Sequence, residues 1–185
     1  MFITYKKNLE RNNFRILRDE SSFSDRRNVE NNVKIYIDSL SYQYKKMKYI
    51  AIYWPLKNEV DLRNLKNSFS LALPRCEDNK SLSFYPWDEN QLTKDSEGIL
   101  SPLNSNSLTF KEISVIFVPC LSVDKNLIRL GYGGGYFDKL RDDKHWRQIP
   151  CIGVLTSNCI SENPLTRADW DIPLSGIITE KEILV

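Results

Sequence analysis

Three short segments, each ending next to a proline, constrain the fold of this chain more than any other feature. They are residues 49–54, 70–73 and 113–118, with prolines at positions 55, 74 and 119. The first and the third are continuous apolar runs, and such a run suits a strand that is covered on both faces, as in a parallel sheet. We therefore expect strands that stop at these prolines, because proline cannot donate to a strand ladder.

Helical patterns alternate with these strands. A polar helix is expected over residues 3–20, and the pair Ser22 and Asp25 resembles a capping signal for a second helix, which has an apolar stripe from Val29 to Leu40. Further helices are expected after Asp61 and from Tyr136, and further strands at the segments 81–85, 151–156 and 176–179. This alternation predicts an α/β three-layer sandwich with a mainly parallel sheet.

The polar segment 87–108 is expected to be a loop, of a length that is usually functional or mobile. With 185 residues, no repeat and no convincing linker, the chain is expected to form a single domain over residues 1–185. Its hydrophobic content of 41% and charged content of 27% are those of a globular protein.

Charge and residue usage exclude several classes of protein. The formal net charge of +2 is too small to indicate a nucleic-acid-binding protein by itself. No apolar run approaches the roughly 18 residues of a membrane helix, and the charged N-terminus does not resemble a secretion signal, so a cytoplasmic location is expected. The four cysteines form no C-x-x-C pair and His145 is the single histidine, which argues for reduced thiols and against a zinc site.

A glycine-rich segment from Arg129 to Asp138 carries most of the functional signal. Four of the seven glycines of the chain lie within residues 131–135. Glycine can adopt positive φ and let a ligand approach the backbone, and successive N–H groups form an anion-binding nest. Arg129 adds a cation, and Asp138 could hold Mg²⁺ beside a phosphate. The spacing fits neither G-x-G-x-x-G nor a Walker A loop, and a plain flexible turn is the alternative.

The order of several motifs resembles the 5-formyltetrahydrofolate cyclo-ligase family. The glycine-rich segment matches the family's Arg-Leu-Gly-x-Gly-x-Gly-Tyr-Tyr-Asp signature, which follows a strand that ends in proline. The other matching segments are 50–55, 58–61, 73–75, 169–174 and 177–180. The resemblance implies a NagB/RpiA/CoA-transferase-like fold. It also implies an enzyme that converts 5-formyltetrahydrofolate to 5,10-methenyltetrahydrofolate, with ATP as co-substrate and Mg²⁺ as cofactor.

The resemblance also assigns roles to individual residues. Lys7 and Arg11 match a pair that contacts the ATP phosphates, and Asp138 and Asp171 match the two Mg²⁺ positions. Arg129 and Tyr136 are the implied catalytic residues. The ATP-binding residues of the glycine-rich segment are Arg129, Leu130, Gly131, Tyr132, Gly133, Gly134, Gly135, Tyr136 and Phe137. The folate-binding residues are Trp54, Glu59, Tyr132 and Tyr136.

The sequence departs from the family pattern at two positions of this segment. Phe137 replaces the second tyrosine of the signature, and Gly134 stands where some members have lysine. Two alternatives stay open: another ATP- or phosphate-binding enzyme with the same fold, or a non-catalytic RNA-binding module that uses the basic N-terminal helix. The expected partners are a reduced formyl-folate and ATP, without nucleic acid or membrane, and the expected state is a monomer.

Overall fold

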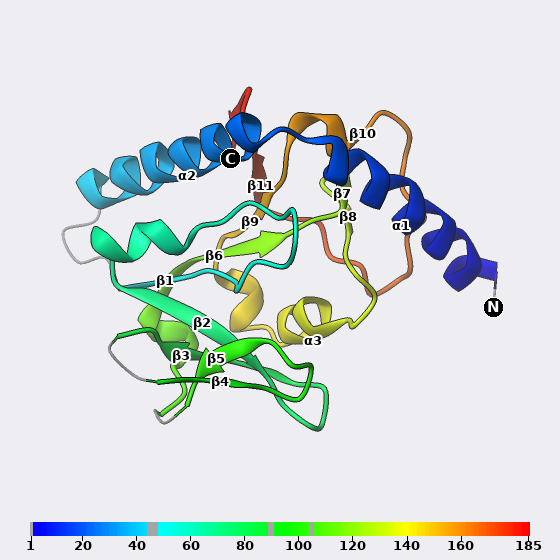
Figure 1. Cartoon of the computed structure of the whole chain (residues 1–185). Helices are drawn as coiled ribbons and strands as arrows, with labels where there is room; N and C mark the ends of the chain where they lie inside the picture. Colours follow the sequence, from blue (N-terminus) through cyan, green and yellow to red (C-terminus); the bar gives the residue numbers. More distant parts are fainter. Residues whose placement is uncertain (1, 44–47, 89–90, 104–105) are drawn as a thin grey trace.

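A seven-stranded sheet forms the centre of the computed structural model, which describes residues 2–43, 48–88, 91–103 and 106–185 (Figure 1). The spatial order of its strands is β12-β11-β9-β6-β1-β2-β3. Their bounds are β1 (Tyr49–Ala51), β2 (Leu71–Cys76), β3 (Leu82–Pro86), β6 (Ile113–Pro119), β9 (Cys151–Val154), β11 (Gly176–Ile178) and β12 (Ile183–Leu184). The five inner strands run parallel, and β3 and β12 are antiparallel edges, so the prediction of a mainly parallel sheet is confirmed.

Helices cover both faces of this sheet. In β1, Ile50 faces the helix α2 (Phe23–Gln43), which buries Val29, Val33 and Ile37 on that side. The neighbouring Ala51 faces the opposite side, toward α3 (Tyr136–Asp142) and the 3₁₀ helix η3 (Trp146–Gln148). This alternation follows from the two-residue period of a strand. Figure 1 shows α2 and α3 on opposite sides of the sheet, which makes three layers.

The N-terminal helix α1 (Phe2–Glu20) lies outside this sandwich, beside a small three-stranded sheet. The strands of this sheet, in spatial order, are β10 (Ile160–Ser161), β7 (Ser122–Asp124) and β8 (Arg129–Leu130). Phe14 of α1 packs against the buried cluster that contains Leu121 and Leu130. The remaining 3₁₀ helices are η1 (Arg63–Asn67), η2 (Phe110–Glu112) and η4 (Ser157–Cys159).

The polar segment 87–108 is not the plain loop that the sequence predicts. It contains a hairpin of β4 (Leu92–Lys94) and β5 (Leu100–Pro102), while residues 89–90 and 104–105 lie outside the described residues. The Asp95 carboxylate accepts hydrogen bonds from the backbone N–H groups of Glu97 and Ile99 and so closes the turn. The hairpin lacks the alternation of apolar and polar residues from which a hairpin is usually recognised, and the side chain of Asp95 stabilises its turn instead.

The expectation that Pro74 stops its strand is also wrong, because β2 continues to Cys76. On one side β2 pairs with β1 only at Leu71 and Ala72, and on the other side Pro74 lies opposite Phe84 of β3. Proline is tolerated where no neighbouring strand needs its N–H. Pro119, in contrast, is the last residue of its strand β6, where it pairs with Val154 of β9.

The strand order places a switch point beside β1. After β1 the chain adds β2 on one side, and it later returns to add β6, β9 and β11 on the other. Ligands of open α/β sheets bind outside the carboxyl ends of the strands at such a point. Among the described residues no helix is long and apolar enough to cross a membrane, and Cys76, Cys120, Cys151 and Cys159 are buried free thiols.

Candidate active site

A pocket of about 350 Å³ opens at the carboxyl ends of β1, β2 and β6. Tyr53 and Trp54 line it directly after β1, and Pro119 lines it at the end of β6. Glu59 and the glycine-rich segment 131–137 complete its wall. The pocket thus lies at the switch point of the sheet and brings together segments that are far apart in the sequence.

Two of the four glycines of this segment adopt the positive φ that the sequence predicts. Gly133 has a φ of 111° and Gly135 has a φ of 74°. Gly135 is the N-cap residue directly before α3. Gly133, Gly134 and Gly135 are exposed, but they line the pocket. Their backbone can therefore approach a bound group without a Cβ in between.

Arg129 lies beneath the glycine-rich segment with only 8% of its side chain exposed. Its guanidinium donates hydrogen bonds of 3.1 and 3.2 Å to the two carboxylate oxygens of Asp138 and one of 3.3 Å to the carbonyl of Pro119. A Cβ on Gly131 would come within 3.0 Å of this guanidinium. Burial lowers the pKa of Arg129, but Asp138 together with Cys120 and Cys151 raises it more, so the group is a cation at the pocket wall.

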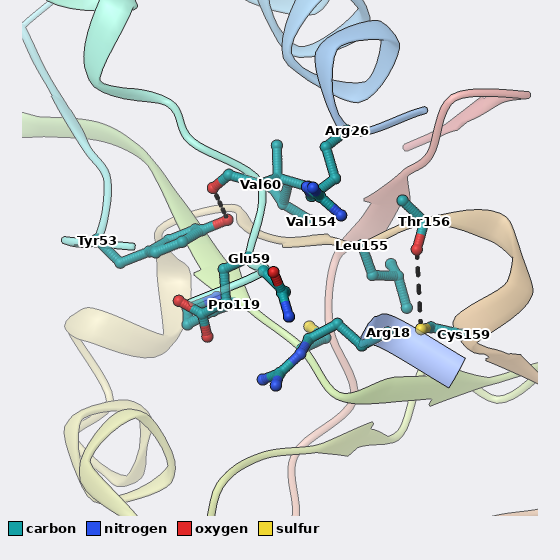
Figure 2. A pocket seen from close by; sticks show the side chains of 12 residues that line it. Arg18, Arg26, Tyr53, Glu59, Val60, Pro119, Val154, Leu155, Thr156 and Cys159 are labelled. Atoms are coloured by element: carbon teal, nitrogen blue, oxygen red, sulfur yellow. Dashed lines mark hydrogen bonds between the residues drawn. The ribbon is translucent and has the colours of Figure 1, made fainter. Parts of the chain in front are cut away.

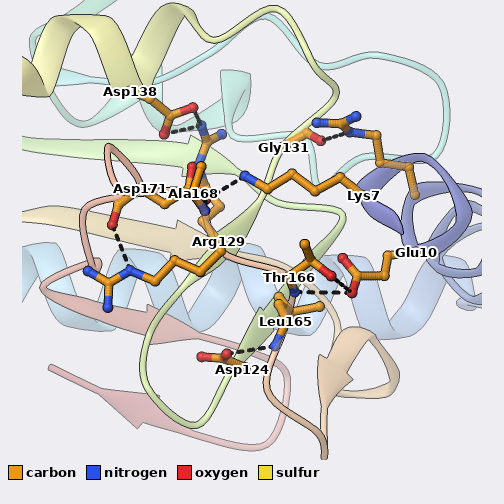
Figure 3. Close-up of polar contacts among 12 residues, drawn as sticks. Lys7, Glu10, Asp124, Arg129, Gly131, Asp138, Leu165, Thr166, Ala168 and Asp171 are labelled. Atoms are coloured by element: carbon orange, nitrogen blue, oxygen red, sulfur yellow. Dashed lines mark hydrogen bonds and ion pairs between the residues drawn. The ribbon is translucent and has the colours of Figure 1, made fainter. Parts of the chain in front are cut away.

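Helix α1 brings two predicted ATP ligands to the same region (Figure 3). Lys7 forms an ion pair with Asp171, and Arg11 Nε donates a 2.9 Å hydrogen bond to the carbonyl of Gly131. The guanidinium of Arg11 also lies against Gly133, where a Cβ would be 3.4 Å from Cζ. Burial lowers the pKa of Arg11, and the charge of Arg15 adds to that effect. Lys7 and Arg11 therefore lie beside the glycine-rich segment and Asp171.

The two carboxylates that the resemblance assigns to Mg²⁺ are each paired with a cation. Asp138 accepts from Arg129, and Asp171 accepts from Lys7 and, at 2.6 Å, from the N–H of Ala168. Over the described part of the chain, no three His, Cys, Asp or Glu side chains gather as a metal site. This donor set still fits Mg²⁺ bound with a nucleotide, because Mg²⁺ commonly takes one or two carboxylates together with phosphate oxygens and waters.

Glu59 presents a free acceptor inside the site. Its Oε2 atom accepts a 2.7 Å hydrogen bond from the N–H of Leu56, whereas no described group donates to the buried Oε1 atom. Burial raises the pKa of Glu59, and the hydroxyl of Tyr132 beside it has the smaller, opposite effect. A buried carboxylate oxygen without a partner is costly unless a ligand supplies the donor. This oxygen therefore fits a ligand that carries N–H groups.

Aromatic side chains flank Glu59 along the pocket. Trp54 lies edge to face with Trp87 at 6.0 Å between ring centroids, and the guanidinium of Arg63 lies 4.6 Å from the Trp54 ring. Tyr132 and Tyr136 line the same pocket. Phe137 lies below the loop, with the Arg129 guanidinium 5.4 Å from its ring centroid. All four predicted folate-binding residues therefore line one pocket.

Sequence reasoning missed two residues of this region. Glu97, on the β4–β5 turn, lines the pocket and accepts a 2.5 Å hydrogen bond from the Tyr136 hydroxyl. Arg18 donates to the Tyr132 hydroxyl at 2.9 Å. Nothing local in the sequence points to Glu97, because its partner lies 39 positions away. Arg18 carries a usable signal, since it follows Arg11 by seven residues and so lies on the same face of α1.

Comparison with known proteins decides the family. The sequence model of the 5-formyltetrahydrofolate cyclo-ligase family matches residues 3–180. The chain belongs to the 5-formyltetrahydrofolate cyclo-ligase family. It is similar to the 5-formyltetrahydrofolate cyclo-ligase of Haemophilus influenzae, with 28% identity over 74% of this chain and 78% of that protein. The similarity to the enzyme of the same name from Mycoplasma pneumoniae is 28% over 73% of this chain and 74% of that protein.

Solved structures agree with this cyclo-ligase assignment. The NMR structure of Aquifex aeolicus 5,10-methenyltetrahydrofolate synthetase superposes with a TM-score of 0.78 and 30% identity, covering 96% of this chain and 91% of that one. The Mycoplasma pneumoniae synthetase structure superposes with a TM-score of 0.69, at 24% identity over 94% and 98% of the chains, and supports the fold alone. The predicted family and enzyme class are confirmed.

Proposed function

We propose that this chain catalyses the ATP-dependent conversion of 5-formyltetrahydrofolate to 5,10-methenyltetrahydrofolate, with release of ADP and phosphate. One observation supports this most: the glycine-rich segment and the unpartnered carboxylate oxygen of Glu59 face the same pocket. The first suits the phosphates of a nucleotide, and the second suits the N–H groups of a pterin. A reaction between ATP and a folate needs both in one place.

The reaction proceeds in two steps. The formyl oxygen of the folate attacks the γ-phosphorus of ATP, and the bond from this phosphorus to the bridging oxygen of ADP breaks. N10 then attacks the activated formyl carbon, the C–O bond breaks and the oxygen leaves as phosphate, and N10 loses its proton to solvent. Phosphoryl transfer needs positioning and charge neutralisation rather than a protein nucleophile.

We assign this positioning to residues that line the pocket and to two cations of α1 beside it. Glu59 holds the pterin through its N–H groups, with Trp54 and Tyr132 beside it. Arg11, Arg129 and Lys7 neutralise phosphate charge, and the backbone of Gly133 to Gly135 approaches the phosphates closely. Tyr136 lies at the start of α3 and lines the pocket, and we assign it to the formyl group.

Mg²⁺ is the metal we propose beside the nucleotide. Asp138 and Asp171 would hold it, and when bound it would neutralise charge on the phosphate oxygens. Both carboxylates raise the pKa of Arg11, which supports a common location beside this cation. Lys7 and Arg129, which pair with these carboxylates, would add positive charge beside the same phosphates.

An assay of the purified protein tests this function directly. Protein, Mg-ATP and 5-formyltetrahydrofolate should give the absorbance of methenyl-folate together with one ADP per product. The Glu59→Gln variant should lose most of this activity, whereas Glu77→Gln, which removes a carboxylate outside the pocket, should keep it. A folded wild-type protein that produces neither methenyl-folate nor ADP would contradict the proposal.

The two alternative functions make different predictions. Another ATP- or phosphate-binding enzyme would not bind 5-formyltetrahydrofolate in calorimetry, and an RNA-binding module would bind RNA with a steep dependence on salt and without ATP turnover. Arg11 and Arg18 of the basic helix contact the glycine-rich segment, which argues against a helix face that is free to bind RNA.

We further propose a NagB/RpiA/CoA-transferase-like fold, supported by the parallel five-stranded core. A monomeric state and a cytoplasmic location stay predictions.

A further inference from the structure

Arg18, near the end of α1, points into the wall that Glu59 and Tyr132 form. Its NH1 atom donates a 2.9 Å hydrogen bond to the Tyr132 hydroxyl, and its guanidinium lies 5.7 Å from the centroid of that ring. Only 15% of the Arg18 side chain is exposed. A guanidinium with this burial and these contacts is held in one place rather than left free in solvent.

The other nitrogens of Arg18 are fixed by its neighbour. Nε and NH2 donate to the same oxygen of Asp19, at 3.1 and 2.8 Å. That oxygen also accepts a 3.0 Å hydrogen bond from Asn58, the residue directly before Glu59. The network therefore connects the end of α1 with the loop that carries Glu59, and it leaves NH1 directed at Tyr132.

Arg18 and Glu59 also border one enclosed space. Both line a cavity of about 10 Å³, which has room for about one water molecule (Figure 2). In this view the guanidinium of Arg18 extends toward the side on which the Glu59 carboxylate lies. Little water separates the two charges, so their attraction is screened less than it would be on an open surface.

We propose that Arg18 is a positioning residue for folate recognition, which fixes the phenol of Tyr132 and holds Glu59 as a carboxylate for the pterin N–H groups. The inference rests on the proposed function, because it assigns a partner to the folate-binding side of the same pocket. Arg18 itself does not line the pocket of about 350 Å³, so it acts through Tyr132 and Glu59.

Other charged groups near Glu59 do not replace Arg18. From α2, Arg26 lines the small cavity, but its NH1 atom donates a 2.6 Å hydrogen bond to the carbonyl of Ser21. In the loop that follows, Asp61 is paired with Arg63 at 2.6 Å. From β1, Tyr53 donates its hydroxyl to the carbonyl of Val60. Burial raises the pKa of Glu59, and the Tyr132 hydroxyl that Arg18 holds, the N–H of Leu56 and the charge of Arg18 oppose this rise, in that order of size.

The position of Arg18 on α1 gives the helix a second role. Arg11 holds the carbonyl of Gly131, and Arg18, two turns later on the same face, holds the side chain of the next residue, Tyr132. One rigid helix therefore fixes adjacent residues of the glycine-rich segment. Gly131 belongs to the part that we assign to the phosphates, and Tyr132 belongs to the part that we assign to the pterin.

Three variants of the full chain test the proposal. Arg18→Gln removes the charge, Arg18→Lys keeps it, and Arg15→Gln is the matched control. Arg15 is an exposed cation on the same helix, and it donates a 3.4 Å hydrogen bond to Asn12. Thermal unfolding of each variant verifies that it is folded, and calorimetry across the acid-to-neutral range measures the binding of 5-formyltetrahydrofolate and, separately, of a non-hydrolysable ATP analogue.

Arg18→Gln should bind the folate at least about tenfold more weakly at neutral pH, because the loss of one hydrogen bond to a charged group has about this effect on affinity. The pH below which folate binding is lost should move upward in this variant, because Glu59 becomes harder to ionise. Arg18→Lys should restore the wild-type pH profile, and Arg15→Gln should match the wild type. A folded Arg18→Gln variant with the folate affinity and pH profile of the wild type would overturn the proposal.

A measurement without ligand separates this proposal from the proposed function. Carboxyl-carbon NMR of the free protein, with the Glu59 signal assigned from Glu59→Gln, should show a higher pKa of Glu59 in Arg18→Gln than in the wild type. An unchanged pKa overturns the role of Arg18, whatever the protein binds. If the pKa rises while the wild type does not bind 5-formyltetrahydrofolate, the electrostatic effect of Arg18 on Glu59 stands, and both the proposed function and the folate role of Arg18 are rejected.

Discussion

Lys7 and Asp171 form an ion pair across 164 positions of the chain, between the N-terminal helix and the loop before β11. Only 14% of the Lys7 side chain and 9% of the Asp171 side chain are exposed. Asp171 also accepts from the N–H of Ala168, so its carboxylate organises its own loop as well. The pair therefore fastens α1 to the wall of the site, next to the residues that we assign to ATP.

Removal of Lys7 should destabilise the free protein. Lys7→Met leaves the carboxylate of Asp171 buried without its cation, and such a loss costs about 3 kcal/mol of unfolding free energy. The double variant Lys7→Met/Asp171→Asn should lose less than the sum of the two single variants, because the unpaired charge is then gone. Urea unfolding without ligand measures both effects.

Asp142 provides a control for this prediction. It pairs with Arg147 at 3.5 Å, but 84% of its side chain is exposed. An exposed pair contributes little, so Asp142→Asn should unfold at nearly the wild-type urea concentration. If Lys7→Met is as stable as Asp142→Asn, the pair with Asp171 does not fasten α1.

Gly98 and Gly135 have nearly the same backbone conformation, so a substitution at each distinguishes the effect of backbone strain from an effect on ATP binding. Gly135 has a φ of 74° and Gly98 has a φ of 76°, and a Cβ on either would meet nothing within 4 Å. Alanine at either position should therefore cost about 1 kcal/mol in unfolding free energy, for the left-handed conformation alone. Only Gly135→Ala should also weaken the binding of ATP, because Gly98 does not line the pocket.

Calorimetry with a non-hydrolysable ATP analogue, together with urea unfolding, checks this pair of variants. Equal losses of ATP affinity in Gly98→Ala and Gly135→Ala would assign the effect to general destabilisation. An ATP affinity of Gly135→Ala equal to that of the wild type would instead show that the phosphates do not approach the backbone at this residue.

The sheet was predictable from the sequence because its inner strands are apolar on both faces. The run 113–118 became β6 almost unchanged, since Val115 and Ile116 are buried against opposite layers. The hairpin β4–β5 was not predictable, because hydrogen bonds of the Asp95 side chain close its turn. Pro74 was misjudged because the effect of a proline depends on which neighbouring strand needs its N–H, and a sequence does not show this.

The part of the candidate site that lies in the glycine-rich segment was predictable from the sequence. Arg129 and Asp138 lie nine positions apart in that segment, and the sequence indicated that both belong to the site, but not that they bind each other. Their pairing depends on the way the glycines fold the chain back over Arg129. Glu97 was missed because it reaches Tyr136 from a separate hairpin, and no spacing in the sequence encodes that contact.

The contact between Tyr136 and Glu97 should set the acidity of the phenol. The hydrogen bond to Glu97 raises the pKa of Tyr136 to about 12, since the carboxylate disfavours a second negative charge beside it. Glu97→Gln should therefore lower the pKa of Tyr136 toward its ordinary value, and ultraviolet titration of phenolate formation measures this shift. Because Glu97 lines the pocket, the variant should also change kcat or KM for the folate.

Glu77 supplies a matched control for Glu97. It accepts a 3.0 Å hydrogen bond from Tyr85, and this pair joins the residue after β2 to β3 without lining the pocket. Glu77→Gln should lower the pKa of Tyr85 and leave the kinetics as they are. If Glu97→Gln and Glu77→Gln have identical kinetics, the contact of Tyr136 with the hairpin has no part in the reaction.

Glu59 should reduce the stability of the protein at neutral pH. Burial raises its pKa above the ordinary value of 4.5, so the folded state favours the protonated form. The resulting stabilisation is complete below the unfolded pKa and is lost as the pH rises through the folded pKa. Glu59→Gln does not titrate, so it should unfold at higher urea than the wild type at neutral pH, and the difference should shrink as the pH falls toward 4.5. The same variant should bind 5-formyltetrahydrofolate more than tenfold more weakly, because the pterin N–H groups lose a charged acceptor. A Glu59→Gln protein that is less stable than the wild type at neutral pH would show that the carboxylate is already satisfied without a ligand, and that its unpartnered oxygen does not await one.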